Sequence, residues 1–205
     1  MRVNKRWFVV MAILFLPLLV VGNAYGETKY RWDIVNLTLV GTTPNINAGG
    51  MASARAQDNS MITLTGSGTF TVGDDSVSGG GTWKTIAPDG TTVTGMGNYL
   101  VTRLIRFEVA PGHQTSVLHG TLTDNRAGLA YLRIAYDDGS KGVLAVSCHL
   151  NGNPPPQGPD AAPASIFEGI TASKGYADYW NRVAPAGSPG TANANRTIFH
   201  ILSGD

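Results

Sequence analysis

Residues 62–72 read ITLTGSGTFTV, and this stretch decides the class of fold that the sequence predicts. Its apolar residues are Ile62, Leu64, Phe70 and Val72. Between and beside them runs a ladder of hydroxyl residues, Thr63, Thr65, Ser67, Thr69 and Thr71. A half-buried strand has this period of two, because successive side chains point to opposite faces of a sheet. The stretch therefore predicts two strands with one apolar face and one hydroxyl face.

The same alternation recurs along the chain. Further strands are expected at residues 31–40, 76–86, 91–109, 116–123, 128–137, 141–150 and 197–202. Turn sequences such as Asp138-Gly139 separate them, and short turns join antiparallel neighbours. The last strand is expected to pair with the first. The sequence thus predicts an all-β antiparallel meander that closes into a barrel, or a strongly curved sandwich, of about seven to eight strands.

A weak repeat of hydroxyl, glycine, any residue, glycine, small polar residue and aromatic runs through three of these strands. Its copies are residues 65–70, 78–83 and 94–99. Folding them about their turns places the glycines in a row, with Trp83 opposite Gly95 and Tyr99 opposite Gly79. Glycine inside a strand marks a sharp bend or a close approach. We expect a barrel corner covered by aromatic rings. The alternative is a glycine floor beneath a ligand.

Residues 1–26 have the organisation of a secretory signal peptide. A basic start precedes an uncharged apolar run at residues 7–21, and small residues follow up to Gly26. The run is shorter than the roughly 20 residues that span a bilayer. We expect cleavage to leave a secreted or periplasmic protein with no membrane contact. Residues 27–205 then form a single β-barrel-like domain.

Composition narrows the class of protein. Loss of Arg2, Lys5 and Arg6 with the signal changes the formal net charge from +1 to about −2. No basic patch remains, so nucleic acid is not an expected partner. Cys148 is the single cysteine, which excludes an intrachain disulfide. A disulfide-free exported domain favours a bacterial origin.

The character of the sequence changes after Leu150. Residues 151–165 are rich in proline and predict a long loop. Residues 166–205 are expected to hold a short helix and the closing strand. The helix is placed at residues 173–183, where Tyr176, Tyr179 and Trp180 have helical spacing and Ser173 can cap the N-terminus.

Residues that carry catalytic or metal chemistry are scattered. The four histidines are His113, His119, His149 and His200, and no metal-binding spacing joins them. Cys148 and His149 are adjacent in a strand, so they point to opposite faces and cannot act as a nucleophile and its base. Turn aspartates such as Asp138 bond their own backbone without an ion. Neither a metal nor a cofactor is expected.

Aromatic residues are the strongest candidates for ligand contacts, because rings beside hydrogen-bonding groups recognise sugars and protein partners. Arg133 is added as a ligand anchor if its side chain lines the barrel interior. The full set is Tyr176, Tyr179, Trp180, Trp83, Tyr99 and Arg133. The structural alternative is that the aromatic side chains of residues 173–183 pack against the barrel without binding a ligand.

At the level of fold, the glycine–aromatic meander resembles small secreted barrels of the lipocalin, dirigent and allene-oxide-cyclase kinds. The lipocalin G-x-W signature is absent, since Trp32 lacks that glycine. Fold alone does not fix function. The sequence favours an exported, non-catalytic protein that binds a small apolar molecule in the barrel or a glycan at the aromatic segment. A barrel enzyme of the cyclase, isomerase or hydrolase type and a cell-surface or matrix structural protein are the alternatives.

Overall fold

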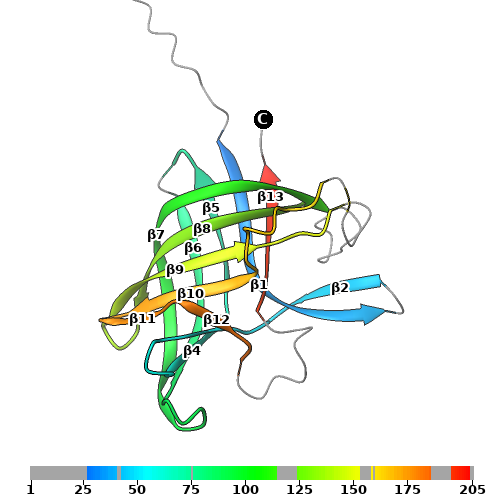
Figure 1. The fold of residues 1–205 in the computed structure, drawn as a ribbon. Coiled ribbons are helices and arrows are strands. Elements are labelled where there is room, and N and C mark those ends of the chain that lie inside the picture. The colour runs from blue at the N-terminus through cyan, green and yellow to red at the C-terminus, as the bar shows by residue number, and fades with distance from the viewer. Residues whose placement is uncertain are drawn as a thin grey trace, which may run out of the picture.

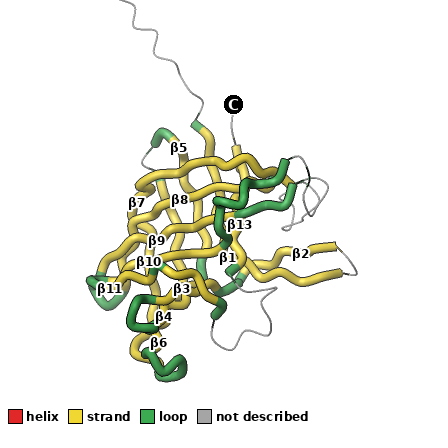
Figure 2. Tube along the Cα trace, in the orientation of Figure 1, coloured by secondary structure: helices red, strands yellow, loops and turns green. Residues whose placement is uncertain are grey.

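The computed structural model describes residues 27–40, 43–74, 76–114, 124–152, 158, 160–185 and 195–203. These residues form thirteen β-strands and no helix, which confirms the predicted all-β class. A strongly curved sheet wraps on itself (Figures 1 and 2). The predicted signal segment, the predicted strand at residues 116–123, His119 and part of the proline-rich loop lie outside the described residues.

Six antiparallel strands close a barrel. They are β1 (Thr28–Val40), β5 (Ser67–Val72), β6 (Val77–Ile86), β7 (Val93–Gln114), β8 (Asn125–Tyr136) and β13 (Arg196–Ser203). Each pairs with the next in the order β1-β5-β6-β7-β8-β13, and β13 returns to β1. The predicted pairing of the last strand with the first is confirmed. Closure leaves these strands without exposed edges where they pair.

Seven further strands extend this barrel. On β8 lie β9 (Lys141–Cys148), β10 (Gly169–Lys174) and β11 (Ala177–Tyr179), in that order. On β6 lie β4 (Met61–Leu64), β3 (Ala52–Arg55) and β12 (Asn181–Val183). The remaining strand, β2 (Thr43–Ala48), pairs with the second half of β1, and the two form a hairpin that stands away from the barrel (Figure 1).

Large side chains fill the barrel. On β8, Leu132 and Ile134 are fully buried while Tyr131 and Arg133 between and beside them are exposed, as strand alternation requires. The largest enclosed side chains include Trp32, Phe70, Tyr99 and Phe199. The rings of Phe107 and Phe199 lie 5.0 Å apart, and those of Phe107 and Phe70 lie 4.8 Å apart. Each fully buried side chain of this size contributes about 1.5–3 kcal/mol.

The strand glycines gather at one bend, as the repeat predicts, but the register differs from the prediction. Trp83 pairs with Gly97, and its ring lies over Gly95, its predicted partner. Tyr99 pairs with Gly81, two residues away from the predicted glycine. The turn between β6 and β7 does not by itself fix which residues pair, because a bulge also shifts the register between these two strands.

Gly81 marks the corner itself. On one side of it β6 pairs with β5, and on the other side β6 pairs with β4. A Cβ atom at Gly81 would lie 2.0 Å from the carbonyl oxygen of Thr65, so the chain between β4 and β5 crosses β6 in backbone contact. The Tyr99 hydroxyl donates a hydrogen bond of 2.8 Å to that same carbonyl. The expected corner with an aromatic cover is therefore present.

The predicted helix at residues 173–183 is wrong. These residues form the end of β10, then β11 and β12, with Gly175 in the left-handed region (φ +58°) at the turn. The hydroxyl of Ser173, the expected helix cap, instead accepts the N–H of Val143 in β9 at 3.0 Å. Backbone pairing with β9 prevails, because a few aromatic residues at this spacing also fit short strands with Tyr179 buried.

Candidate functional site

The six residues that the sequence nominates fall into two groups. Trp83 and Tyr99 are buried and lie around Tyr136, with ring centroids 5.8 and 6.3 Å from its own. Tyr179 is also buried and belongs to the same core cluster. The other three are exposed: Tyr176 at the turn after β10, Trp180 between β11 and β12, and Arg133 on the outer face of β8. The nominated residues therefore do not form one ligand site.

The buried group holds a cation of the protein itself. The ammonium of Lys174 lies 4.1 Å from the centroid of the Trp83 ring and 4.9 Å from that of Tyr136. It donates hydrogen bonds to the carboxylate of Asp138 and, at 2.8 Å, to the hydroxyl of Ser140. The hydrogen bond from Lys174 lowers the pKa of Asp138 to about 2. The cluster therefore anchors the β8–β9 turn to the end of β10.

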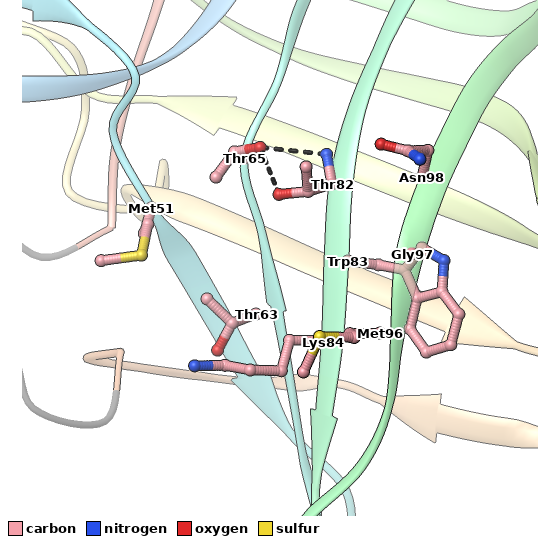
Figure 3. Close-up of a pocket in the computed structure, with 9 residues that line it drawn as sticks. All are labelled: Met51, Thr63, Thr65, Thr82, Trp83, Lys84, Met96, Gly97 and Asn98. Carbon is pink, nitrogen blue, oxygen red and sulfur yellow. Dashed lines mark hydrogen bonds between the residues drawn. The ribbon is translucent and has the colours of Figure 1, made fainter.

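A groove of about 350 Å³ lies on the outer face of β4, β6 and β7 (Figure 3). Six of its side chains form two rows across these strands: Thr65, Thr82 and Asn98 in the first, and Thr63, Lys84 and Met96 in the second. Met51 comes from the segment before β3 and adds a second thioether to the lining. The groove thus combines hydroxyl, amide and ammonium groups with two apolar side chains.

Strand alternation places these side chains outward. Trp83 points into the core, so its neighbours Thr82 and Lys84 lie on the opposite face of β6. Figure 3 shows the Trp83 side chain directed away from the threonines. The groove therefore lies on one side of the same sheet whose other side carries the aromatic cluster.

Hydrogen bonds fix the two threonines of the first row. The Thr82 N–H donates to the Thr65 hydroxyl oxygen at 3.0 Å, and the two hydroxyl oxygens lie 2.7 Å apart (Figure 3). Below them, the Thr63 hydroxyl is bonded to the buried Ser53 hydroxyl at 2.7 Å. Preorganised hydroxyls lose little conformational entropy when a ligand binds.

One carboxylate lies beside β7 on the opposite face of the sheet, next to the Trp83 ring. Asp137 accepts the Trp83 indole N–H at 2.9 Å and the Asn98 backbone N–H at 2.7 Å. These hydrogen bonds, led by that of Asn98, lower the pKa of Asp137 below its ordinary value. Asp137 thus ties the β8–β9 turn to β6 and β7.

Among the carboxyl groups of the described residues, Glu168 has the most strongly shifted pKa. Its two carboxylate oxygens accept the backbone N–H of His149 at 2.6 Å and of Thr197 at 2.7 Å. Burial raises its pKa to about 7, although both hydrogen bonds and the charge of Arg196 act in the opposite direction. The arrangement ties the end of β9 to β13 through the residue before β10. An ionisable side chain therefore holds these strands together.

Cys148 is a fully buried free cysteine, and burial raises the pKa of its thiol. A free cysteine at such a site packs as a small hydrophobic side chain. Within the described ranges no group of three or more metal-ligating side chains is arranged to hold an ion. The described residues also include no helix that is long and apolar enough to cross a membrane.

Sequence reasoning recognised the threonine face but missed the groove. Thr63 and Thr65 stood out by their alternation, whereas Lys84, Met96 and Asn98 carry no motif. Their contribution depends on the register that pairs Thr63 with Lys84 and Lys84 with Met96. The sequence signal that could have revealed the groove was the row of outward-facing residues on β6.

Comparisons of the chain with protein-family models, curated proteins and solved structures gave no match. The fold is a six-stranded antiparallel barrel with added strands.

Proposed function

We propose that this chain is an exported, non-catalytic binding protein whose ligand is a glycan held in the groove on β4, β6 and β7. The basic, apolar and small-residue pattern of residues 1–26 supports export. The observation that carries the binding proposal is the double row of mainly polar side chains in a concavity of about 350 Å³. Ligand sites for small molecules begin at about this volume.

Because side chains fill the interior of the barrel, we place the ligand on the outer surface. Side chains such as Trp32, Phe70 and Phe199 occupy the lumen, where an apolar ligand or a set of catalytic groups would have to lie. Arg133, the nominated anchor of such a lumen, is on the outer face. The geometry therefore favours a surface ligand over the apolar-ligand and lumen-enzyme alternatives.

The chemistry of the groove matches a sugar. Hydroxyl and amide groups such as those of Thr82 and Asn98 can donate to and accept from sugar hydroxyls. The thioethers of Met51 and Met96 offer adaptable apolar contact for the C–H faces of a ring. Both methionines are exposed, so contact with a ligand would bury apolar surface.

Glycan arrays and native mass spectrometry of protein purified from its host test this proposal. We expect glycan binding that weakens at least about tenfold in a Thr82→Val, Asn98→Ala double variant, since two hydrogen bonds are lost. Thr69→Val is the matched control, because Thr69 bonds Ser78 on the same sheet outside the groove. No glycan bound by the wild-type protein, or equal binding by the double variant, would reject the groove as the site.

A structural protein of the cell surface or matrix is the second candidate, and the β1–β2 hairpin favours it. Beyond Val35, β1 pairs only with β2 among the described strands, and β2 pairs only with β1. The sequence from Ile34 to Ala54 carries no charge, whereas exposed edges are usually protected by charged residues. Such an edge can pair with the same edge of another copy.

Light scattering coupled to size exclusion, run over a range of protein concentrations, tests this second candidate. Assembly that grows with concentration, that Asn36→Lys abolishes and that Thr91→Lys leaves intact is the expected result. Asn36 lies on the hairpin and Thr91 in a distant turn, and both are exposed. A monomer at every concentration would exclude assembly through the hairpin.

A further inference from the structure

We infer, resting on the proposed glycan binding, that the groove selects an acidic sugar and that Lys84 binds its carboxylate. Lys84 is the one charged side chain among the residues that line the groove. It stands in the middle of the second row, with Thr63 of β4 on one side and Met96 of β7 on the other (Figure 3). The class of ligand follows from how this ammonium is placed.

The ammonium of Lys84 is available to a ligand. The ion pairs of the described part of the chain join other cations to acids, and Lys84 takes part in none of them. Lys84 is half-buried rather than fully extended into water. A cation that is partly withdrawn from water gains more from an anionic partner than a fully solvated one does. Lys174, by contrast, already has its own rings and carboxylate.

The charges around the groove set the direction of the ligand. The side chains of the first row are neutral, and Asp137 lies behind them, on the face of the sheet that carries the Trp83 ring. An anionic group is therefore drawn to the Lys84 side of the groove. The exposed hydroxyl of Thr82, between Asn98 and Thr65, faces the neutral part of the ligand. A carboxylate with sugar hydroxyls beside it fits this order.

The number of charges favours a carboxylate over a sulfate- or phosphate-rich ligand. The groove offers a single cation, and the chain without residues 1–26 has a net charge of about −2. A densely charged polyanion is bound by clusters of lysine and arginine. A uronic acid, with one negative charge per ring, needs only one ammonium. The volume of about 350 Å³ suits a short stretch of such a chain.

Isothermal titration calorimetry with three probes tests the inference: an oligogalacturonate, the same oligomer with its carboxyl groups reduced to alcohols, and a sulfated oligosaccharide. For the wild-type protein we expect the oligogalacturonate to bind at least about tenfold more tightly than its reduced form, and less tightly as salt is added. The Lys84→Met variant keeps the stem of the side chain and should bind both forms equally. Lys141→Met, which removes an exposed lysine on β9, should behave as the wild type.

The outcomes separate the inference from the proposal on which it rests. Equal binding of the acidic and reduced oligomers by the wild-type protein would overturn the role of Lys84 while leaving glycan binding in place. Preference for the sulfated probe would overturn the carboxylate assignment. Binding of none of the probes, with no array hit, would remove both. Thermal unfolding of Lys84→Met confirms that any loss is not a loss of fold.

Discussion

The ammonium of Lys174 sits 4.1 Å from the centroid of the Trp83 ring, although the two residues come from different parts of the sheet. Trp83 belongs to β6 of the closed barrel, and Lys174 ends β10, one of the added strands. The same ammonium bonds Asp138 in the turn between β8 and β9. One side chain thus joins the barrel, an added strand and a turn, and this contact has measurable consequences.

Lys174→Met should destabilise the protein and raise the pKa of Asp138. The variant keeps the apolar stem but loses a cation–π contact worth about 1–2 kcal/mol when partly desolvated. The Lys174 side chain is 13% exposed, which meets that condition. Urea unfolding measures the stability, and NMR titration should follow the Asp138 pKa upward from about 2. Lys141→Met is the control, and equal stability of the two variants would contradict the role of Lys174.

Gly81→Ala should destabilise the barrel corner by about 1–3 kcal/mol or more, the usual cost of forcing added atoms into a packed region. The added Cβ would meet the Thr65 carbonyl oxygen at 2.0 Å, and backbone atoms cannot rotate away. Gly90→Ala is the control: Gly90 has φ +75° but open space, so only backbone strain is added there. Denaturant unfolding should give a lower free energy of unfolding for Gly81→Ala than for Gly90→Ala. The reverse order would contradict a crossing at Gly81.

The sequence alone predicts those strands of the barrel whose pattern has a local cause. The alternation in β4, β5 and β8 follows from side chains facing opposite sides of a strand, and it is visible without a structure. Strands β2 and β3 escaped notice because Pro44 and the pair Gly49-Gly50 resemble a loop. They are held by pairing with β1 and β4, which the local sequence does not encode.

The candidate groove was beyond local reasoning because it depends on register. A shift of two residues between β6 and β7 decides whether Trp83 faces Gly95 or Gly97, and with it which β7 side chains flank Lys84. The predicted helix at residues 173–183 was wrong for a related reason. Tyr179 is buried by tertiary packing, whereas Tyr176 and Trp180 are exposed in the connections between short strands.

Glu168 should make the protein less stable as pH rises. The pKa of its carboxyl is about 7 in the folded state and near 4.5 when unfolded, so between these values the folded state binds more protons. Stability is then present below about pH 4.5 and is lost as pH rises towards and through 7, by on the order of 3 kcal/mol. Denaturant unfolding at pH 5 and pH 8 measures this difference.

Glu168→Gln provides the control for this pH dependence. The amide cannot ionise, so the free energy of unfolding should change less between pH 5 and pH 8 than in the wild type. The variant also places an amide N–H beside the backbone N–H of His149 or Thr197, so its stability at pH 5 should be lower. The same steep pH dependence in both proteins would assign it to another group.

Asn195→Ala should destabilise the junction of β3, β12 and β13. The Asn195 side chain accepts the Ser53 N–H at 2.6 Å and donates to the Val183 carbonyl at 2.6 Å, while its backbone has φ +56°. Leaving buried backbone groups unpaired costs about 1–3 kcal/mol each. Asn195→Gly separates the two causes, because glycine adopts this φ without strain but offers no amide.

If the hydrogen bonds carry the stability, Asn195→Gly loses most of what Asn195→Ala loses. If the backbone conformation carries it, the glycine variant unfolds close to the wild type. Asn47→Ala, which removes an exposed amide bonded to Thr38, should cost less than either. Residues 195–197 read NRT and match the glycosylation sequon. Because the Asn195 amide already bonds the Ser53 N–H and the Val183 carbonyl, Asn195 should stay unmodified when the folded protein is exposed to a transferase, as mass measurement of its peptide can verify.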